Sequence, residues 1–140
     1  MPGETIKIRN CIICDDARQE VGGKSFLIDV YAGAMVNPAF PLVVPTFAVY
    51  IEAMFANHDY QNVFVLISPP HGHSVTSSVG SPVHINNLQY PASLSFRFPA
   101  MQFPAEGEYQ IYLHADDERV LVSTFSVVKP PIPTEKVGLM

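Results

Sequence analysis

Charged side chains are scarce in this sequence, and their scarcity limits the functions that it can have. Only 15% of the 140 residues are charged, against about 25% in ordinary soluble domains. The formal net charge is −5, and the eight Lys and Arg residues are scattered along the chain. A nucleic-acid-binding protein normally gathers such residues into a basic patch. We therefore expect no nucleic-acid partner.

Long apolar runs and targeting signals are also missing. No apolar run approaches the roughly 18 residues that a membrane-spanning helix needs. The first residues, MPGETIKIRN, lack the apolar core of a secretory signal. We therefore expect a cytoplasmic protein without a membrane partner, in which both cysteines are thiols rather than a disulfide.

No stretch has the period of an amphipathic helix, whereas short alternating segments recur between turns. Thirteen prolines and eight glycines separate these segments. This pattern predicts an all-β fold, a single antiparallel β-sandwich of the immunoglobulin-like kind with about seven or eight strands. We expect the sandwich to span residues 1–128 and the proline-rich residues 129–140 to be a flexible tail.

Strands are predicted where β-branched and aromatic residues alternate with polar ones. Residues 63–67, VFVLI, are instead a continuous apolar run, which suggests a strand covered on both faces or a central strand of a sandwich. The main ones cover residues 6–14, 26–31, 46–55, 63–67, 92–98, 108–114 and 119–128, and segments 74–77 and 83–86 are shorter candidates. Three prolines within residues 38–45 exclude a central strand there. The charged connection after the first strand is a candidate for a short helical turn over residues 16–20.

That connection is the most charged stretch of the chain and contains a candidate site. Its ionisable residues are Asp15, Asp16, Arg18, Glu20 and Lys24. Adjacent aspartates on a strand point in different directions, so paired acid–base catalysis would need a further partner. We favour a salt-bridged connection in which Arg18 holds a carboxylate, and a binding surface is the alternative. Arg18 is then expected to matter more for stability than Arg97.

Two histidines flank a glycine in a polar loop and are the candidate metal ligands. His71 and His73 could share one ion, with His58, His84 or His114 as a third ligand. Solvated imidazoles in a Pro-Gly loop are the simpler interpretation, and we expect no resident cofactor. The chain contains no nucleophile elbow, phosphate-binding loop, dinucleotide-binding motif or zinc-protease motif, which argues against an enzyme.

The middle of the chain is almost free of charge. Between residues 31 and 104 the charged residues are Glu52, Asp59 and Arg97. Charge depletion with abundant Tyr, Phe and Met is typical of interface cores, and strand edges without Lys invite pairing with another chain. We therefore predict a non-catalytic binding or assembly module, a homo-oligomer or part of a larger protein assembly, which associates through uncharged sheet surfaces.

Two other functions stay open at this point. One is a metal-binding protein or metal-dependent enzyme that uses His71 and His73. The other is a carbohydrate-binding sandwich, because exposed aromatic rings stack on sugars. The candidate rings for that function are Tyr50, Tyr60, Tyr90 and Tyr112.

The opening of the chain resembles that of a known family. The residues that carry the resemblance are Cys14-Asp15-Asp16-Ala17-Arg18-Gln19-Glu20, followed by Gly23-Lys24 and a strand that ends at Tyr31. They are similar to the start of a family of small uncharacterised bacterial and phage-borne proteins, a domain of unknown function. The resemblance covers about residues 5–128 and implies no activity. That family has a glycine where this chain has Asp29.

A second resemblance concerns the fold alone. Gly107-x-Tyr109 before a strand resembles the tyrosine corner of immunoglobulin-like sandwiches, in which the phenol bonds back to the backbone. Tyr109 is therefore expected to mark a corner of the fold.

Overall fold

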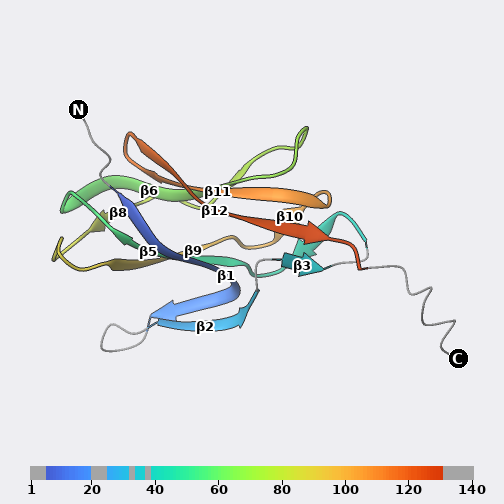
Figure 1. Ribbon diagram of the computed structural model, residues 1–140, viewed down its shortest axis with the longest axis horizontal. Coiled ribbons are helices and arrows are strands. Elements are labelled where there is room, and N and C mark those ends of the chain that lie inside the picture. The colour runs from blue at the N-terminus through green and yellow to red at the C-terminus, as the bar shows by residue number, and fades with distance from the viewer. Residues whose placement is uncertain (1–5, 20–24, 32–33, 37–38, 131–140) are drawn as a thin grey trace, which may run out of the picture.

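The computed structural model describes residues 6–19, 25–31, 34–36 and 39–130, and these form an all-β sandwich (Figure 1). Within them lie twelve strands and no helix. The strands are β1 (Lys7–Gln19), β2 (Ser25–Val30), β3 (Ala34–Val36), β4 (Leu42–Val44), β5 (Ala48–Met54), β6 (Asp59–Ser68), β7 (Thr76–Ser77), β8 (Ser81–His84), β9 (Ala92–Arg97), β10 (Met101–Phe103), β11 (Gly107–Ala115) and β12 (Glu118–Val128). The predicted sandwich is confirmed, but the number of strands was underestimated. The strands β3, β4 and β10, which the pattern does not predict, have three residues each, too few for an alternating pattern.

Two main sheets make up the sandwich. One has the order β2-β1-β5-β9, and the other has the order β3-β12-β11-β6-β7, with β8 also paired to β6. A two-stranded sheet of β10 and β4 accompanies them. Among these pairs only β12 and β3 run parallel. Figure 1 shows β6, β11 and β12 lying over β5 and β9.

Strand β1 takes part in two different pairings. Residues 7–14 pair with β5, and residues 14–19 pair with β2. The β1–β2 ribbon consequently extends away from the sandwich (Figure 1). The helical turn predicted over residues 16–20 is wrong for its described part, because residues 16–19 continue the strand. Polar residues suit this ribbon because it can satisfy its backbone hydrogen bonds through β2 while its side chains stay near water.

The core is built from alternate residues of the central strands. Val63, Val65 and Ile67 of β6 lie beside Ile111 and Leu113 of β11 in the same sheet, and all five side chains are buried. A group of aromatic rings fills one end of this core. It consists of Phe47, Phe98, Phe103, Tyr109 and Phe125, with neighbouring ring centroids 5.3 to 6.2 Å apart.

The Gly107-x-Tyr109 segment forms a corner at the start of β11. The Tyr109 hydroxyl donates a hydrogen bond to the carbonyl oxygen of Ala105 at 2.6 Å, and its ring is fully buried. Gly107 has φ +141°, and a Cβ there would lie 2.7 Å from Cγ of Pro70. Glycine is therefore required both by the backbone conformation and by the close approach of the β6–β7 connection.

Strand β12, the last of the described strands, ends at Val128. Of the predicted tail, only Lys129 and Pro130 lie among the described residues. The backbone N–H of Lys129 donates to a carboxylate oxygen of Glu106 at 3.3 Å. Residues 131–140, together with 1–5, fall outside the described residues.

Candidate functional site

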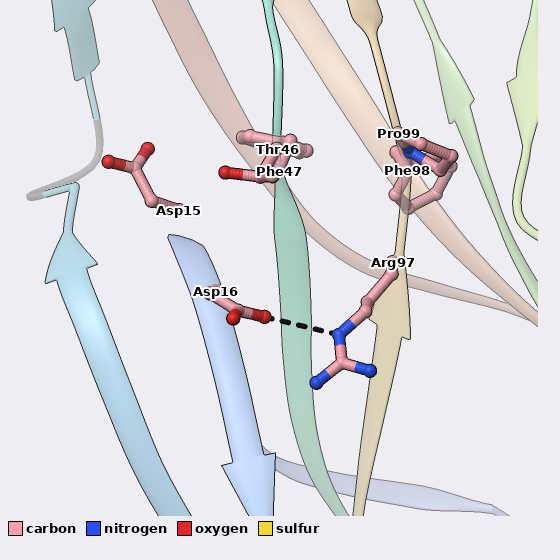
Figure 2. A pocket seen from close by; sticks show the side chains of 7 residues that line it. All are labelled: Asp15, Asp16, Thr46, Phe47, Arg97, Phe98 and Pro99. Atoms are coloured by element: carbon pink, nitrogen blue, oxygen red, sulfur yellow. Dashed lines mark hydrogen bonds and ion pairs between the residues drawn. The ribbon is translucent and has the colours of Figure 1, made fainter.

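A pocket opens where β1 leaves β5 and begins to pair with β2 (Figure 2). Its volume is about 220 Å³. The lining residues are Asp15, Asp16, Thr46, Phe47, Arg97, Phe98 and Pro99. The floor is aromatic, because Phe47 and Phe98 are both buried, while the two aspartates and Arg97 supply the charges at its rim.

Asp16 is the centre of the polar contacts at this pocket. Its carboxylate accepts hydrogen bonds from the backbone N–H of Ala17 at 2.8 Å and from Nε of Arg97 at 3.1 Å. Nε of Arg18 lies 3.4 Å from the other carboxylate oxygen. Desolvation acts to raise the pKa of Asp16, but these hydrogen bonds outweigh it and the pKa is lowered. The carboxylate is therefore held in its charged form.

Arg97 connects β9 to β1 across the intervening strand β5. Besides its contact with Asp16, its Nη2 donates to the carbonyl oxygen of Ala17 at 2.7 Å. Figure 2 shows the side chain lying across the sheet toward Asp16. Beneath it, Cys14 and Ala48 are fully buried and, with Ala17 and Leu27, form a small apolar cluster.

Asp15 has a separate partner on the other side of the strand. The Tyr31 hydroxyl donates to its carboxylate at 2.5 Å, and the backbone N–H of Tyr31 donates to the carbonyl oxygen of Ile13. Burial, followed by the hydrogen bond and the negative charge of Asp15, raises the pKa of Tyr31. The phenol is thus kept protonated and serves as a donor.

The two cysteines of β1 do not line this pocket and are poor nucleophiles. Burial raises the pKa of Cys11 to about 12. Burial and the nearby charges of Asp16 and Asp15 also raise the pKa of Cys14. Because the thiolate is the reactive form, both side chains act as small apolar groups.

The structure brings together some of the predicted charged cluster and adds two residues to it. Asp15, Asp16 and Arg18 lie together, whereas Glu20 and Lys24 fall outside the described residues. Sequence reasoning missed Tyr31 and Arg97 as partners. A signal for Arg97 was available, because it is the one cation in the charge-poor middle of the chain. The Asp15–Tyr31 contact joins β1 to the end of β2, and the Asp16–Arg97 contact joins β1 to β9. We call these two contacts the clamp.

The histidines are spread over the molecule. His71 and His73 are exposed in the turn after β6, whereas His58 and His84 lie at its other end, with ring centroids 6.2 Å apart. The ten residues of β6 separate these ends by about 30 Å. His114 instead stacks on Phe64. Across the described ranges, no three His, Cys, Asp or Glu side chains gather as a metal site would require.

The tyrosines proposed to stack on sugars differ in exposure. Tyr50 and Tyr60 are buried, and both hydroxyls are hydrogen-bonded. They are therefore closed to a ligand. Tyr90 is exposed before β9, and Tyr112 is half-buried on β11.

One sheet surface carries a row of apolar and aromatic side chains toward the outside. We call it the outer face, and its residues are Phe64, Leu66, Tyr112, His114 and Leu121. The ring centroids of Phe64 and His114 are 4.6 Å apart, and Leu121 is 51% exposed. Burial, and then the charge of Arg119, lower the pKa of His114, so this face stays uncharged near neutral pH.

Comparison with known proteins identifies a family without an assigned role. A family model described as a family of unknown function (DUF6941) matches residues 10–128, which is most of the chain. No curated protein matches the sequence. Among the described residues, no helix has the length and apolar character needed to cross a membrane.

Proposed function

The chain belongs to the DUF6941 family, which brings no known activity with it, and we propose from its own surfaces that it is a non-catalytic binding and assembly module. In this proposal two copies associate through the outer face. The partnered carboxylates of the pocket, together with the protonated thiols of β1, support a structural rather than a catalytic role for that region.

The observation that carries the proposal is the composition of the outer face. Strands β6, β11 and β12 place apolar or aromatic side chains side by side, in rows such as Leu66, Tyr112 and Leu121. Aromatic enrichment without charge distinguishes the core of an interface from an ordinary surface.

Charges at the two ends of the outer face suit a second copy. Arg119 lies beside His114, with its guanidinium carbon 4.1 Å from the Tyr112 ring centroid. Glu108 is exposed near the opposite end of β11, on the same side as Tyr112. A two-fold axis across the strands reverses their direction in the second copy. It brings Arg119 of each copy near Glu108 of the other, and the apolar residues meet between them.

Sedimentation velocity of the untagged protein tests the proposal. We expect a dimer or larger species that persists at micromolar concentration, and Leu121→Glu should remove the two-fold pair. In the chain truncated after Pro130, which keeps every described residue, this variant should be a monomer. Tyr90→Glu is the matched control, because it also places a carboxylate at an exposed apolar site, one outside the outer face. Arg119→Glu should weaken the dimer, and the double variant Arg119→Glu/Glu108→Arg should restore it.

Two results would contradict this interface. One is a wild-type monomer at about 100 μM, a concentration at which even weak specific pairs associate. The other is an oligomer of the chain truncated after Pro130 that Leu121→Glu leaves intact while circular dichroism shows all variants folded. In that second case self-association would proceed through another surface.

We extend the proposal to the setting of the protein. Its negative net charge and scattered cations support a protein partner rather than nucleic acid or membrane, with a homo-oligomer or a larger assembly as the product. We further propose a cytoplasmic location and a bacterial or phage origin. The Cys-Asp-Asp-x-Arg-x-Glu opening is proposed as a shared feature of the family, because part of it builds the clamp.

A further inference from the structure

Strand β9 is an edge strand that lacks the usual features that prevent pairing with another chain. It pairs with β5 on one side, and none of the described strands pairs with its other side. Its residues Ala92–Arg97 carry no charge before the last position. Natural edge strands are normally blunted by Lys, Pro, a bulge or a covering segment. This edge can therefore accept the backbone hydrogen bonds of a further strand.

A groove runs along this free edge. Two adjoining cavities of about 390 and 480 Å³ share Ser78, Val79, Arg97 and Pro99. One wall is β9 and the other is the segment between β7 and β8, in which Val79 is 88% exposed. Because this second wall stands beside the edge, a single extended segment can enter, whereas the edge of another whole sheet is obstructed.

The chemistry of the groove specifies its occupant. Leu94 and Phe96 point toward the sandwich core, and Ser93 and Ser95 point outward. The buried Oγ of Ser95 has no hydrogen-bond partner within the described part of the chain. Glu52 lies next to Ser93 on the outward side of β5. An extended segment with alternating apolar residues, small residues between them and a cation near Glu52 is therefore complementary.

The chain contains such a segment outside the described residues. Residues 134–140, TEKVGLM, are free of proline and one residue longer than β9. In a parallel pairing, Val137 and Leu139 would lie beside Leu94 and Phe96, and Gly138 beside Ser95. Lys136 then stands next to Ser93 and within reach of Glu52. We infer that residues 134–140 of a second copy add to the edge of β9 as a strand.

The short reach of residues 129–133 favours a groove occupied by residues 134–140 of a second copy rather than of the same chain. Residues 129–133 carry three prolines, and as an extended spacer they reach about 15 Å. Strand β12, from which they start, lies three strand spacings from β7, which is about 14 Å. Crossing its own sheet would use the spacer before the segment enters the groove. A neighbouring copy placed alongside needs no such crossing, and the contact is head-to-tail, so it can propagate.

A labelled synthetic peptide tests the inference directly. The peptide comprises residues 129–140, and the receptor is the chain truncated after Pro130, which retains every described residue. We expect saturable binding by fluorescence anisotropy, at least about tenfold weaker when the peptide carries Leu139→Lys. A peptide with Lys136→Glu should also bind more weakly, and Glu52→Lys in the receptor should restore it. Because both weakening changes are in the peptide, loss of folding of the receptor does not explain the weaker binding.

An experiment on the full-length protein distinguishes a segment that comes from a second copy from one that comes from the same chain. In the Leu121→Glu background, in which the outer face is disabled, we expect the full chain to associate and the truncated chain to be monomeric. Binding of a scrambled peptide as strong as that of the native one would overturn the inference. So would a monomeric full-length Leu121→Glu protein, even if the peptide binds, because the segment would then fold back on its own chain. Neither result affects the dimer proposed through the outer face.

Discussion

At the scale of single residues, Arg97 and Arg18 both contact Asp16, but only Arg97 joins two different strands through its contacts. Arg97 bonds both Asp16 and the backbone of Ala17 and so joins β9 to β1. Arg18 contacts Asp16 from two positions along the same strand, and the two arginine side chains are equally exposed, at 63% and 62%. We predict that Arg97→Ala lowers the urea midpoint of unfolding, whereas Arg18→Ala changes stability by about 0.5 kcal/mol or less.

This order is the reverse of the one expected from sequence. Equal midpoints for the two variants would show that the contacts of Arg97 do not bear on stability. Arg97→Lys provides a further comparison, because it keeps the charge but cannot reproduce the two directed hydrogen bonds.

The lowered pKa of Asp16 predicts how the stability of the fold changes at acidic pH. Its pKa is lowered in the folded chain, so the folded state binds fewer protons than the unfolded state at acidic pH. The stabilisation is complete above the ordinary pKa of 3.8 and is lost as the pH falls through the lower folded value. Urea unfolding measured from about pH 2 to 7 should show a flatter acid limb for Asp16→Asn than for the wild type. Parallel acid limbs would assign the acid sensitivity to other carboxylates.

Asp29 adopts a backbone conformation that suits glycine. Its φ is +55°, in the left-handed region, where a side chain costs roughly 1 to 2 kcal/mol. Asp29→Gly removes this cost, but it also raises the conformational entropy of the unfolded chain, which lowers the free energy of unfolding. We predict equal or higher stability, by up to about 1 kcal/mol. Asp29→Val is the control and should destabilise, because β-branched residues avoid positive φ. Thermal unfolding of both variants measures the difference.

At the scale of elements, the Tyr109 hydroxyl holds the corner at the start of β11 by donating to the carbonyl oxygen of Ala105 and accepting from its backbone N–H. Tyr109→Phe removes the donor to Ala105 and leaves the ring in the aromatic cluster. We predict a loss of about 1 kcal/mol in the free energy of unfolding. Tyr112→Phe is the matched control, since its hydroxyl bonds Gln110 at a half-buried site. A similar small loss in both variants would mean that the corner adds nothing beyond an ordinary hydrogen bond.

Strand patterning predicted the central elements well and the peripheral ones poorly. The strands over residues 92–97 and 108–114 are predicted because one face of each is buried, which imposes alternation, whereas residues 63–67 are predicted from a continuous apolar run. The continuation of β1 over residues 15–19 was missed because the β1–β2 ribbon projects from the core and needs no apolar face. Arg97 was missed as a partner of Asp16 because the two are 81 positions apart, and pairing through β5 leaves no local signal.

At the scale of the whole molecule, two surfaces remain open after the core is formed. The outer face presents a flat apolar area with opposite charges at its ends, which fits a closed two-fold pair. The edge of β9 presents a recessed groove, which fits an extended segment. Together they would allow dimers to join through their terminal segments, and such an assembly requires no catalytic group.

The most direct test of this account is native mass spectrometry of the untagged protein, run with Leu121→Glu beside it. The account predicts that the wild type is a dimer or a larger assembly without bound metal or ligand mass. The variant should lose the two-fold pair while remaining folded. A wild-type monomer, or a single copy that carries an extra ligand mass, would contradict the assembly role and return attention to the pocket beside Asp15.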